Sequence, residues 1–236
     1  MTLVAALRRA LDEHADPAIA AGQAAYMQNI QPFRGVKTPE RRALLRACLA
    51  AHPVTDYESY RAGVRELWRG KFREERYLAL DLAARLKPFR RDALPLFEEM
   101  LAETDWWDVL DPLATDLLGG ALRGQPAMLA ARVRTWRDDD HLWTRRAALL
   151  VQLKYRQDTD RELLAETILQ LAPEKEFFIR KAIGWALREY AKTEPRWVKA
   201  FVAEHENELS ALSRREALKH VDGRAQRMPR ASRTSS

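Results

Sequence analysis

The sequence has little of what a disulfide-bonded or many-turned protein needs. Cys48 is the single cysteine, so one chain can form neither an internal disulfide nor a thiolate metal cluster. Only 9 of the 236 residues are glycine, which disfavours a β fold with many turns. No run of about 18 apolar residues occurs, and residues 1–9 lack the order of a signal peptide. We therefore expect a soluble, cytoplasmic protein without a membrane partner.

Several motifs of familiar chemistry are also missing. The chain has no glycine-rich phosphate loop and no His/Cys set at metal-ligand spacing, and its five histidines are scattered. No lysine occupies a setting that marks a Schiff-base nucleophile. We therefore expect a site that needs no metal and no cofactor.

Positive charge is in excess. The formal net charge is +6 and the isoelectric point is about 9.6, which suits a polyanionic partner, although solubility alone could explain it. Residues 222–236 contain four arginines and no apolar periodicity. We predict that this tail is disordered and adds non-specific attraction to a polyanion.

Apolar residues recur at helical spacing along the chain, and 47% of all residues are hydrophobic. Helix starts are expected at Thr38-Pro39-Glu40, with Thr38 as the N-cap and Pro39 at the first helical position, and at Thr55-Asp56. Short links rich in Pro, Asp or Gly indicate stacked antiparallel pairs, and no segment shows a strand pattern. Beyond these two starts, the predicted helical runs are 76–86, 93–101, 106–118, 128–136, 142–155, 163–171, 177–190, 198–202 and 214–221.

A repeat of about 35 residues supports this stacking. The marked positions are Arg42, Arg76, Asp111, Arg146, Lys181 and Arg215. A period in this range predicts an all-α fold, an α-solenoid of stacked helix pairs, in which equivalent positions share one surface. Five of the six positions are cationic, so we expect a basic concave face; solvated helix starts would give the same pattern. The exception in the row is Asp111.

Asp111 lies in the least ordinary stretch of the chain. Trp107 precedes it by four residues and therefore shares its helical face, and Pro112 follows and can bend the helix there. The alternative is a tryptophan that anchors a helix contact beside a capping acid. Two further residues leave alternatives open. Trp185 either packs in the core or faces a functional groove, and Arg146 is either an ordinary surface arginine or part of that groove.

These stretches resemble the AlkD family of HEAT-like-repeat DNA glycosylases, from about Tyr26 to His220. The residues that carry the resemblance include Tyr26-Met27, Gly35-Val36-Lys37-Thr38-Pro39-Glu40, Trp106-Trp107-Asp108-Val109-Leu110-Asp111, Gln152-Leu153-Lys154-Tyr155, Lys181-Ala182-Ile183-Gly184-Trp185 and Ser213-Arg214-Arg215-Glu216-Ala217. The resemblance is weaker over the first 25 residues and absent from the tail. It implies a single repeat domain, 1–221, followed by the tail.

The resemblance implies hydrolysis of the N-glycosidic bond of 7-methylguanine, 3-methyladenine and bulky cationic adducts in double-stranded DNA. The resemblance also implies that the base is not flipped and that an abasic site remains. Asp111 is then the catalytic carboxylate, Trp107 and Trp185 flank the lesion sugar, and Arg146 completes the site. The residues expected to contact DNA are Tyr26, Thr38, Arg42, Arg76, Lys154, Lys181, Arg188 and Arg215. We expect a monomer that associates with the nucleoid when bound to DNA.

Hydrolysis of this N-glycosidic bond can be catalysed by a single carboxylate such as Asp111. An alkylated, cationic purine is already a good leaving group, so one carboxylate can suffice to stabilise the developing sugar cation and to hold the attacking water. Two alternatives remain: a non-catalytic repeat protein that binds DNA or RNA by shape, and a protein-binding scaffold. Asp111 with its two tryptophans argues against the first, and the basic row argues against the second.

Overall fold

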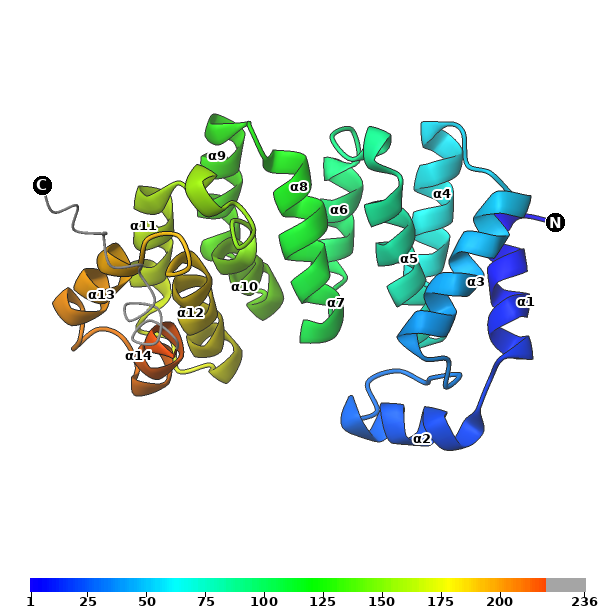
Figure 1. Ribbon diagram of the computed structural model, residues 1–236, viewed down its shortest axis with the longest axis horizontal. Coiled ribbons are helices and arrows are strands. Elements are labelled where there is room, and N and C mark those ends of the chain that lie inside the picture. Colours follow the sequence, from blue (N-terminus) through cyan, green and yellow to red (C-terminus); the bar gives the residue numbers. More distant parts are fainter. Residues whose placement is uncertain (220–236) are drawn as a thin grey trace, which may run out of the picture. The chain divides into compact units, whose positions relative to one another are not determined.

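The computed structural model describes residues 1–219, so the predicted tail lies outside the described residues. Every regular element in this range is a helix (Figure 1), which confirms the all-helical prediction. No described helix is long and apolar enough to cross a membrane. The chain divides into two compact units, and the boundary along the sequence lies between Arg123 and Gly124, a division that the sequence analysis does not anticipate. Gly124 has a φ of +78°, a conformation that glycine adopts without strain.

The first unit contains α1 to α8. In chain order these are α1 (Leu3–Glu13), α2 (Pro17–Tyr26), α3 (Thr38–Ala51), α4 (Tyr57–Trp68), α5 (Arg73–Arg85), the 3₁₀ turn η1 (Lys87–Phe89), α6 (Leu94–Ala102), α7 (Trp107–Pro112), the π-helix η2 (Leu113–Leu118) and α8 (Gly119–Leu122). Short links fold successive helices onto one another, as α4 and α5 show. The core of this unit is filled by Leu7, Leu11, Tyr60, Leu67, Trp68, Leu78, Leu82, Phe97, Met100, Leu110 and Leu113.

Local sequence accounts for most helix starts in this unit. Asp16 and Asp56 accept backbone N–H bonds at the N-termini of α2 and α4, as expected of capping acids. The predicted cap at Thr38 is wrong by one residue, because α3 begins at Thr38 and Lys37 precedes it without a side-chain hydrogen bond. Helices α1 and α2 were not among the predicted runs, and α2 buries no residue fully.

The predicted helix 106–118 is instead a composite that runs from Trp107 to Leu122. Pro112 lies inside it, and the next six residues form a π-helix. Proline has no N–H to donate, and the N–H of Gly119 bonds five residues back to the carbonyl of Ala114. Such widened turns occur often at functional sites, and this one begins two residues after Asp111.

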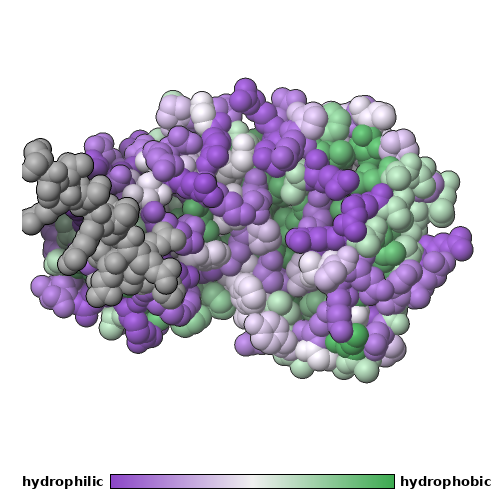
Figure 2. Space-filling view, viewed as in Figure 1, coloured by the Kyte–Doolittle hydropathy of each residue, from purple (hydrophilic) through white to green (hydrophobic). Residues whose placement is uncertain are grey.

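The second unit contains α9 to α14. These are α9 (Pro126–Arg137), α10 (Leu142–Leu150), the 3₁₀ turn η3 (Arg156–Asp158), α11 (Arg161–Leu171), α12 (Phe177–Tyr190), α13 (Pro195–Glu204) and α14 (Ala211–Leu218). The bounds of α12 are those predicted, whereas α10 stops five residues before the predicted end at Tyr155. Turns follow it there. Hydrophilic side chains cover much of the molecular face in Figure 2, with apolar residues between them.

Gly184 lets α12 and α14 approach closely. A Cβ atom on this glycine would lie 2.5 Å from the Cβ of Glu216 and 2.8 Å from the carbonyl oxygen of Ser213. We expect Gly184→Ala to lower the free energy of unfolding by about 1–3 kcal/mol, because the backbone of α14 must move. Chemical denaturation measures this. Gly22→Ala is the matched control, since nothing lies within 4 Å of its added Cβ; equal losses in both variants would contradict the close-packing explanation.

Candidate functional site

A buried ion pair fixes the first turn of α7 to α5. Arg73 is fully buried; its Nη2 donates to Asp108 Oδ1 at 2.5 Å and its Nη1 to Asp105 Oδ1 at 2.8 Å. Burial alone would lower the pKa of Arg73, but the hydrogen bonds and charges of these two carboxylates outweigh it and raise the pKa. The guanidinium therefore stays charged and holds the start of α7 in place.

Tyr77 strengthens this attachment. Its hydroxyl donates to Asp108 Oδ2. Burial, together with the negative charge of Asp108, raises the pKa of Tyr77 well above its ordinary value. The phenol therefore remains protonated and can act as a donor at neutral pH.

Asp111 follows Asp108 by three residues on the same helix. Trp107 and Asp111 both belong to α7, four residues apart, and both are half-buried. The helical spacing places the two side chains on one side of α7, as predicted. Asp111 therefore lies on a helix whose first turn is tied to α5 through Asp108.

A cavity of about 370 Å³ lies within the first unit beside this helix. Three of the residues predicted to contact DNA, Tyr26, Thr38 and Arg42, line it together. Pro112, the residue after Asp111, also lines it. The remaining wall is made by Gln23, Met27, Phe33, Arg41, Tyr77, Leu80, Asp81 and Asp108.

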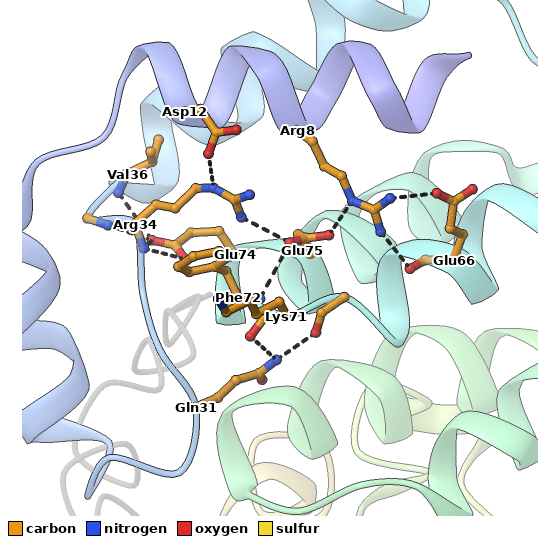
Figure 3. A network of polar contacts seen from close by, with 12 residues as sticks. Arg8, Asp12, Gln31, Arg34, Val36, Glu66, Lys71, Phe72, Glu74 and Glu75 are labelled. Atoms are coloured by element: carbon orange, nitrogen blue, oxygen red, sulfur yellow. Dashed lines mark hydrogen bonds and ion pairs between the residues drawn. The ribbon is translucent and has the colours of Figure 1, made fainter. Parts of the chain in front are cut away.

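The segment 27–37 between α2 and α3 is anchored by two buried acids (Figure 3). The Glu74 carboxylate accepts from the backbone N–H groups of Arg34, Gly35 and Val36, at 2.8–3.2 Å. Glu75 accepts from the Arg34 side chain at 2.9 Å. Since this segment joins Tyr26 to Thr38, these contacts fix the positions of two cavity-lining residues.

The buried charges of residues 73–75 were missed by the sequence analysis. Arg73 and Glu74 are fully buried and Glu75 is 1% exposed, although consecutive charged residues usually mark a solvated surface. The signal available in the sequence was their position directly before the predicted helix 76–86. In the structure they form the first turn of α5. Each of the three is satisfied by partners from other segments, which a sequence pattern does not reveal.

The predicted row of cations is not evenly exposed in the first unit. The side chain of Arg42 is 58% exposed and pairs with Asp81 at 3.2 Å. Arg76 is only 17% exposed and pairs with Asp105 at 2.9 Å, with its guanidinium 5.1 Å from the ring centroid of Trp68. Burial lowers the pKa of Arg76. Arg76 therefore supports packing, whereas Arg42 faces solvent.

The second unit divides its predicted cations in the same way. Arg146 is 4% exposed, and its Nη1 donates to the carbonyl of Phe178 at 2.5 Å. Arg215 and Lys154 are exposed. The expectation that the repeat register gives one exposed basic row is thus corrected: equivalent positions meet different neighbours, and these neighbours decide exposure.

Glu216 forms ion pairs with two further residues that were predicted to contact DNA. Lys181 Nζ lies 2.8 Å from Glu216 Oε1, and Arg188 donates to the other carboxylate oxygen. The hydrogen bond from Lys181, followed by the charges of both cations, lowers the pKa of Glu216. Trp185 lies on α12 with Lys181 and Arg188, one residue after Gly184, and is half-buried.

The four residues predicted for catalysis are divided between the units. Trp107 and Asp111 belong to the first unit, and Arg146 and Trp185 belong to the second. Each unit thus carries half of the predicted set, and a joint site formed by all four remains a prediction.

Comparison with known proteins gives a family for the chain. Residues 7–221 match a family model described as "DNA alkylation repair enzyme". A solved structure described as a "Predicted DNA alkylation repair enzyme from Enterococcus faecalis" is 31% identical, with a TM-score of 0.80 over 87% of this chain and 96% of that one. A DNA-bound alkylpurine DNA glycosylase, AlkC from Pseudomonas fluorescens, is 17% identical with a TM-score of 0.47, over 93% of this chain and 61% of that one. No curated protein matches.

Proposed function

Because the chain belongs to the DNA alkylation repair enzyme family, we propose that it is a DNA glycosylase acting on alkylated purines. It hydrolyses the N-glycosidic bond of cationic bases such as 7-methylguanine and 3-methyladenine, or of bulkier adducts, and leaves an abasic site. The observation that carries the proposal is Asp111, held on α7 one turn beyond the buried Arg73–Asp108 pair.

One carboxylate is sufficient for this reaction. A positively charged alkylated purine leaves without protonation, so the barrier lies in the positive charge that develops on the sugar. The fixed negative charge of Asp111 stabilises that transition state, and its oxygens can hold the attacking water. The proposed mechanism uses no general acid, no lysine nucleophile and no cofactor.

The remaining members of the proposed site bind the damaged nucleotide. Trp107 and Trp185 offer aromatic faces to the lesion sugar, which allows the base to stay stacked instead of entering a pocket. Arg146 is the fourth member of the proposed set, and we assign to it the contact with the nearby DNA backbone. The chain acts as a monomer in the cytoplasm, associated with the nucleoid when it is bound to DNA.

A base-release assay tests the proposal. The full chain is incubated with duplex DNA that carries 7-methylguanine, and the free base is separated by chromatography. We expect time-dependent release with formation of abasic sites that break on heating with base. Tight duplex binding without release would instead support the non-catalytic, shape-binding alternative.

Removing either proposed sugar-facing tryptophan should slow the chemistry. We expect Trp107→Ala and Trp185→Ala each to reduce the single-turnover release rate about 2- to 12-fold, since aromatic contacts are worth about 0.5–1.5 kcal/mol beyond the area they bury. Binding to undamaged duplex should change less than this. An equal loss in undamaged binding, or a lower melting temperature, would show that the tryptophan concerned is structural.

Arg42 and Arg215 should supply phosphate contacts. We expect Arg42→Ala and Arg215→Ala each to weaken binding about equally for all duplex sequences. Each should lower the slope of log affinity against log salt by about one unit, because one ionic contact is lost. Arg61→Ala is the control: Arg61 also has an exposed side chain with one ion pair, to Glu58, but it lies outside the repeat register. An identical effect at Arg61 would show that any surface charge suffices.

A further inference from the structure

A second hollow of the first unit adjoins the cavity beside α7. This hollow, the α3–α5 groove, has a volume of about 620 Å³ and shares two lining residues with the cavity, Arg42 and Asp81. The residues that line the groove alone are Leu45, Arg46, Ala84, Arg85, Leu86 and Lys87. Because the two hollows share part of one wall, an extended molecule that passes the cavity can continue into the groove.

The groove follows two helices that run in the same direction. The guanidinium of Arg41 on α3 lies 4.7 Å from the ring centroid of Tyr77 on α5, and Arg46 and Arg85 line the groove further along the same two helices. From Tyr77 to Arg85, α5 rises by about 12 Å. Since Tyr77 contacts Asp108 of α7, the groove leads away from the helix that carries the proposed catalytic carboxylate.

Positive charge dominates the lining of the groove. Its four cationic residues, all exposed, are Arg42, Arg46, Arg85 and Lys87. Asp81 is the one carboxylate among the lining residues, and it already accepts from Arg41 through Oδ2 and from Arg42 through Oδ1, at 3.2 Å each. Within residues 1–219, the side chains of Arg46, Arg85 and Lys87 have no ion-pair partner. The groove therefore carries positive charge that the described chain does not neutralise.

The apolar part of the lining strengthens the field of these cations. Leu45 is 3% exposed, and Ala84 and Leu86 are half-buried. A cleft with a low-dielectric wall and charges of one sign focuses the electrostatic field and concentrates counter-ions. The cations extend over α3, α5 and η1, so the groove suits an extended chain of phosphates better than one small anion.

We propose that the α3–α5 groove binds the phosphate backbone of duplex DNA on one side of the lesion. This inference rests on the proposed function, which makes alkylated DNA the substrate. The rise of about 12 Å along α5 corresponds to about 3–4 base pairs, so Arg46, Arg85 and Lys87 contact phosphates of neighbouring nucleotides and not the lesion itself. Such contacts fix the register and orientation of the duplex without reading its sequence.

The first arm of the test measures ionic contacts on undamaged duplex DNA. The affinity of the full chain is followed by fluorescence anisotropy between about 50 and 200 mM salt. We expect Arg46→Ala, Arg85→Ala and Lys87→Ala each to lower the slope of log affinity against log salt by about one unit, and the triple variant by about three. Arg46→Lys keeps the charge and should keep the wild-type slope.

Arg196→Ala is the matched control for this arm. Arg196 is an exposed arginine of α13 that, like Arg46, has no ion pair with any described residue. It lies outside the groove, so its removal should leave the slope unchanged. Melting temperatures of all variants verify folding.

The second arm locates the contact on the DNA. Duplexes carry an abasic-site analogue, which fixes the register of the protein, and are shortened to about 2 base pairs on one side of the analogue or on the other. On the full-length duplex the triple variant should bind more weakly than wild type. Shortening the side that enters the groove should abolish this difference, whereas shortening the other side should preserve it. A difference that survives both truncations would overturn the assignment to flanking phosphates.

The outcomes separate this inference from the glycosylase proposal. An unchanged slope in the folded triple variant, or an equal change in Arg196→Ala, overturns the groove as a DNA contact. A slope change on duplex RNA of the same sequence but not on duplex DNA also overturns it. Since the first arm uses undamaged DNA, it does not depend on catalysis. Absence of base release from methylated DNA, with the groove effect intact, would overturn the glycosylase proposal alone.

Discussion

Asp111→Asn is expected to reduce the single-turnover release of 7-methylguanine by on the order of a hundredfold or more, with folding and duplex binding retained. Asparagine keeps the shape of the side chain but removes the negative charge that would face the developing sugar cation, and one lost electrostatic stabiliser typically costs this much. The helix itself should persist, because the ion pair between Asp108 and Arg73 that ties α7 to α5 is unchanged in this variant.

The matched control is Asp158→Asn, which removes an equal charge from an exposed position in η3. Its release rate should equal that of wild type. Release by Asp111→Asn within a few-fold of wild type would overturn the assignment of the catalytic carboxylate.

Arg73→Met is expected to be the most destabilising single change in the first unit. Arg73 is fully buried and Asp108 has a side chain only 5% exposed, so methionine leaves a buried carboxylate without its cation. Breaking such a pair by removing one partner costs about 3–5 kcal/mol. Chemical denaturation followed by tryptophan fluorescence measures the loss, since Trp106 and Trp107 lie at the start of α7.

Two further variants distinguish this cause from general damage. Arg61→Met removes an exposed arginine and should leave the denaturation midpoint unchanged. Adding Asp108→Asn to Arg73→Met should recover part of the loss, because a neutral amide needs no counter-charge. A wild-type midpoint for Arg73→Met would show that the pair contributes no net stability.

Local patterns predicted the helices well where one face is continuously apolar. The bounds of α12 follow from such a stripe, and Asp56 caps α4 as its position before a helical run indicates. The prediction was poorer where the pattern is weak or interrupted. Helix α2 buries no residue, and Pro112 changes a predicted continuous helix into α, π and α segments, whose hydrogen bonding depends on packing as well as on sequence.

The main feature that the sequence could not supply was which residues each charged side chain contacts. Arg42 and Arg76 occupy the same repeat position, yet Arg42 is exposed while Arg76 is held between Asp105 and Trp68. Likewise, Glu74 looks like a surface acid, but it binds three backbone N–H groups about forty residues earlier in the chain. Contacts over such distances depend on how helices pack, which periodicity does not encode.

The sequence by itself determined the all-helical class, the positions of most helices, and the pairing of Trp107 with Asp111 on one helical face, because these depend on neighbours within four residues. Only the tertiary structure decided which charges are buried, where the segment 27–37 is anchored, and which residues of α2, α3, α5 and α7 line one cavity. Those properties arise from segments far apart in the chain, where packing in three dimensions sets both burial and hydrogen-bond partners.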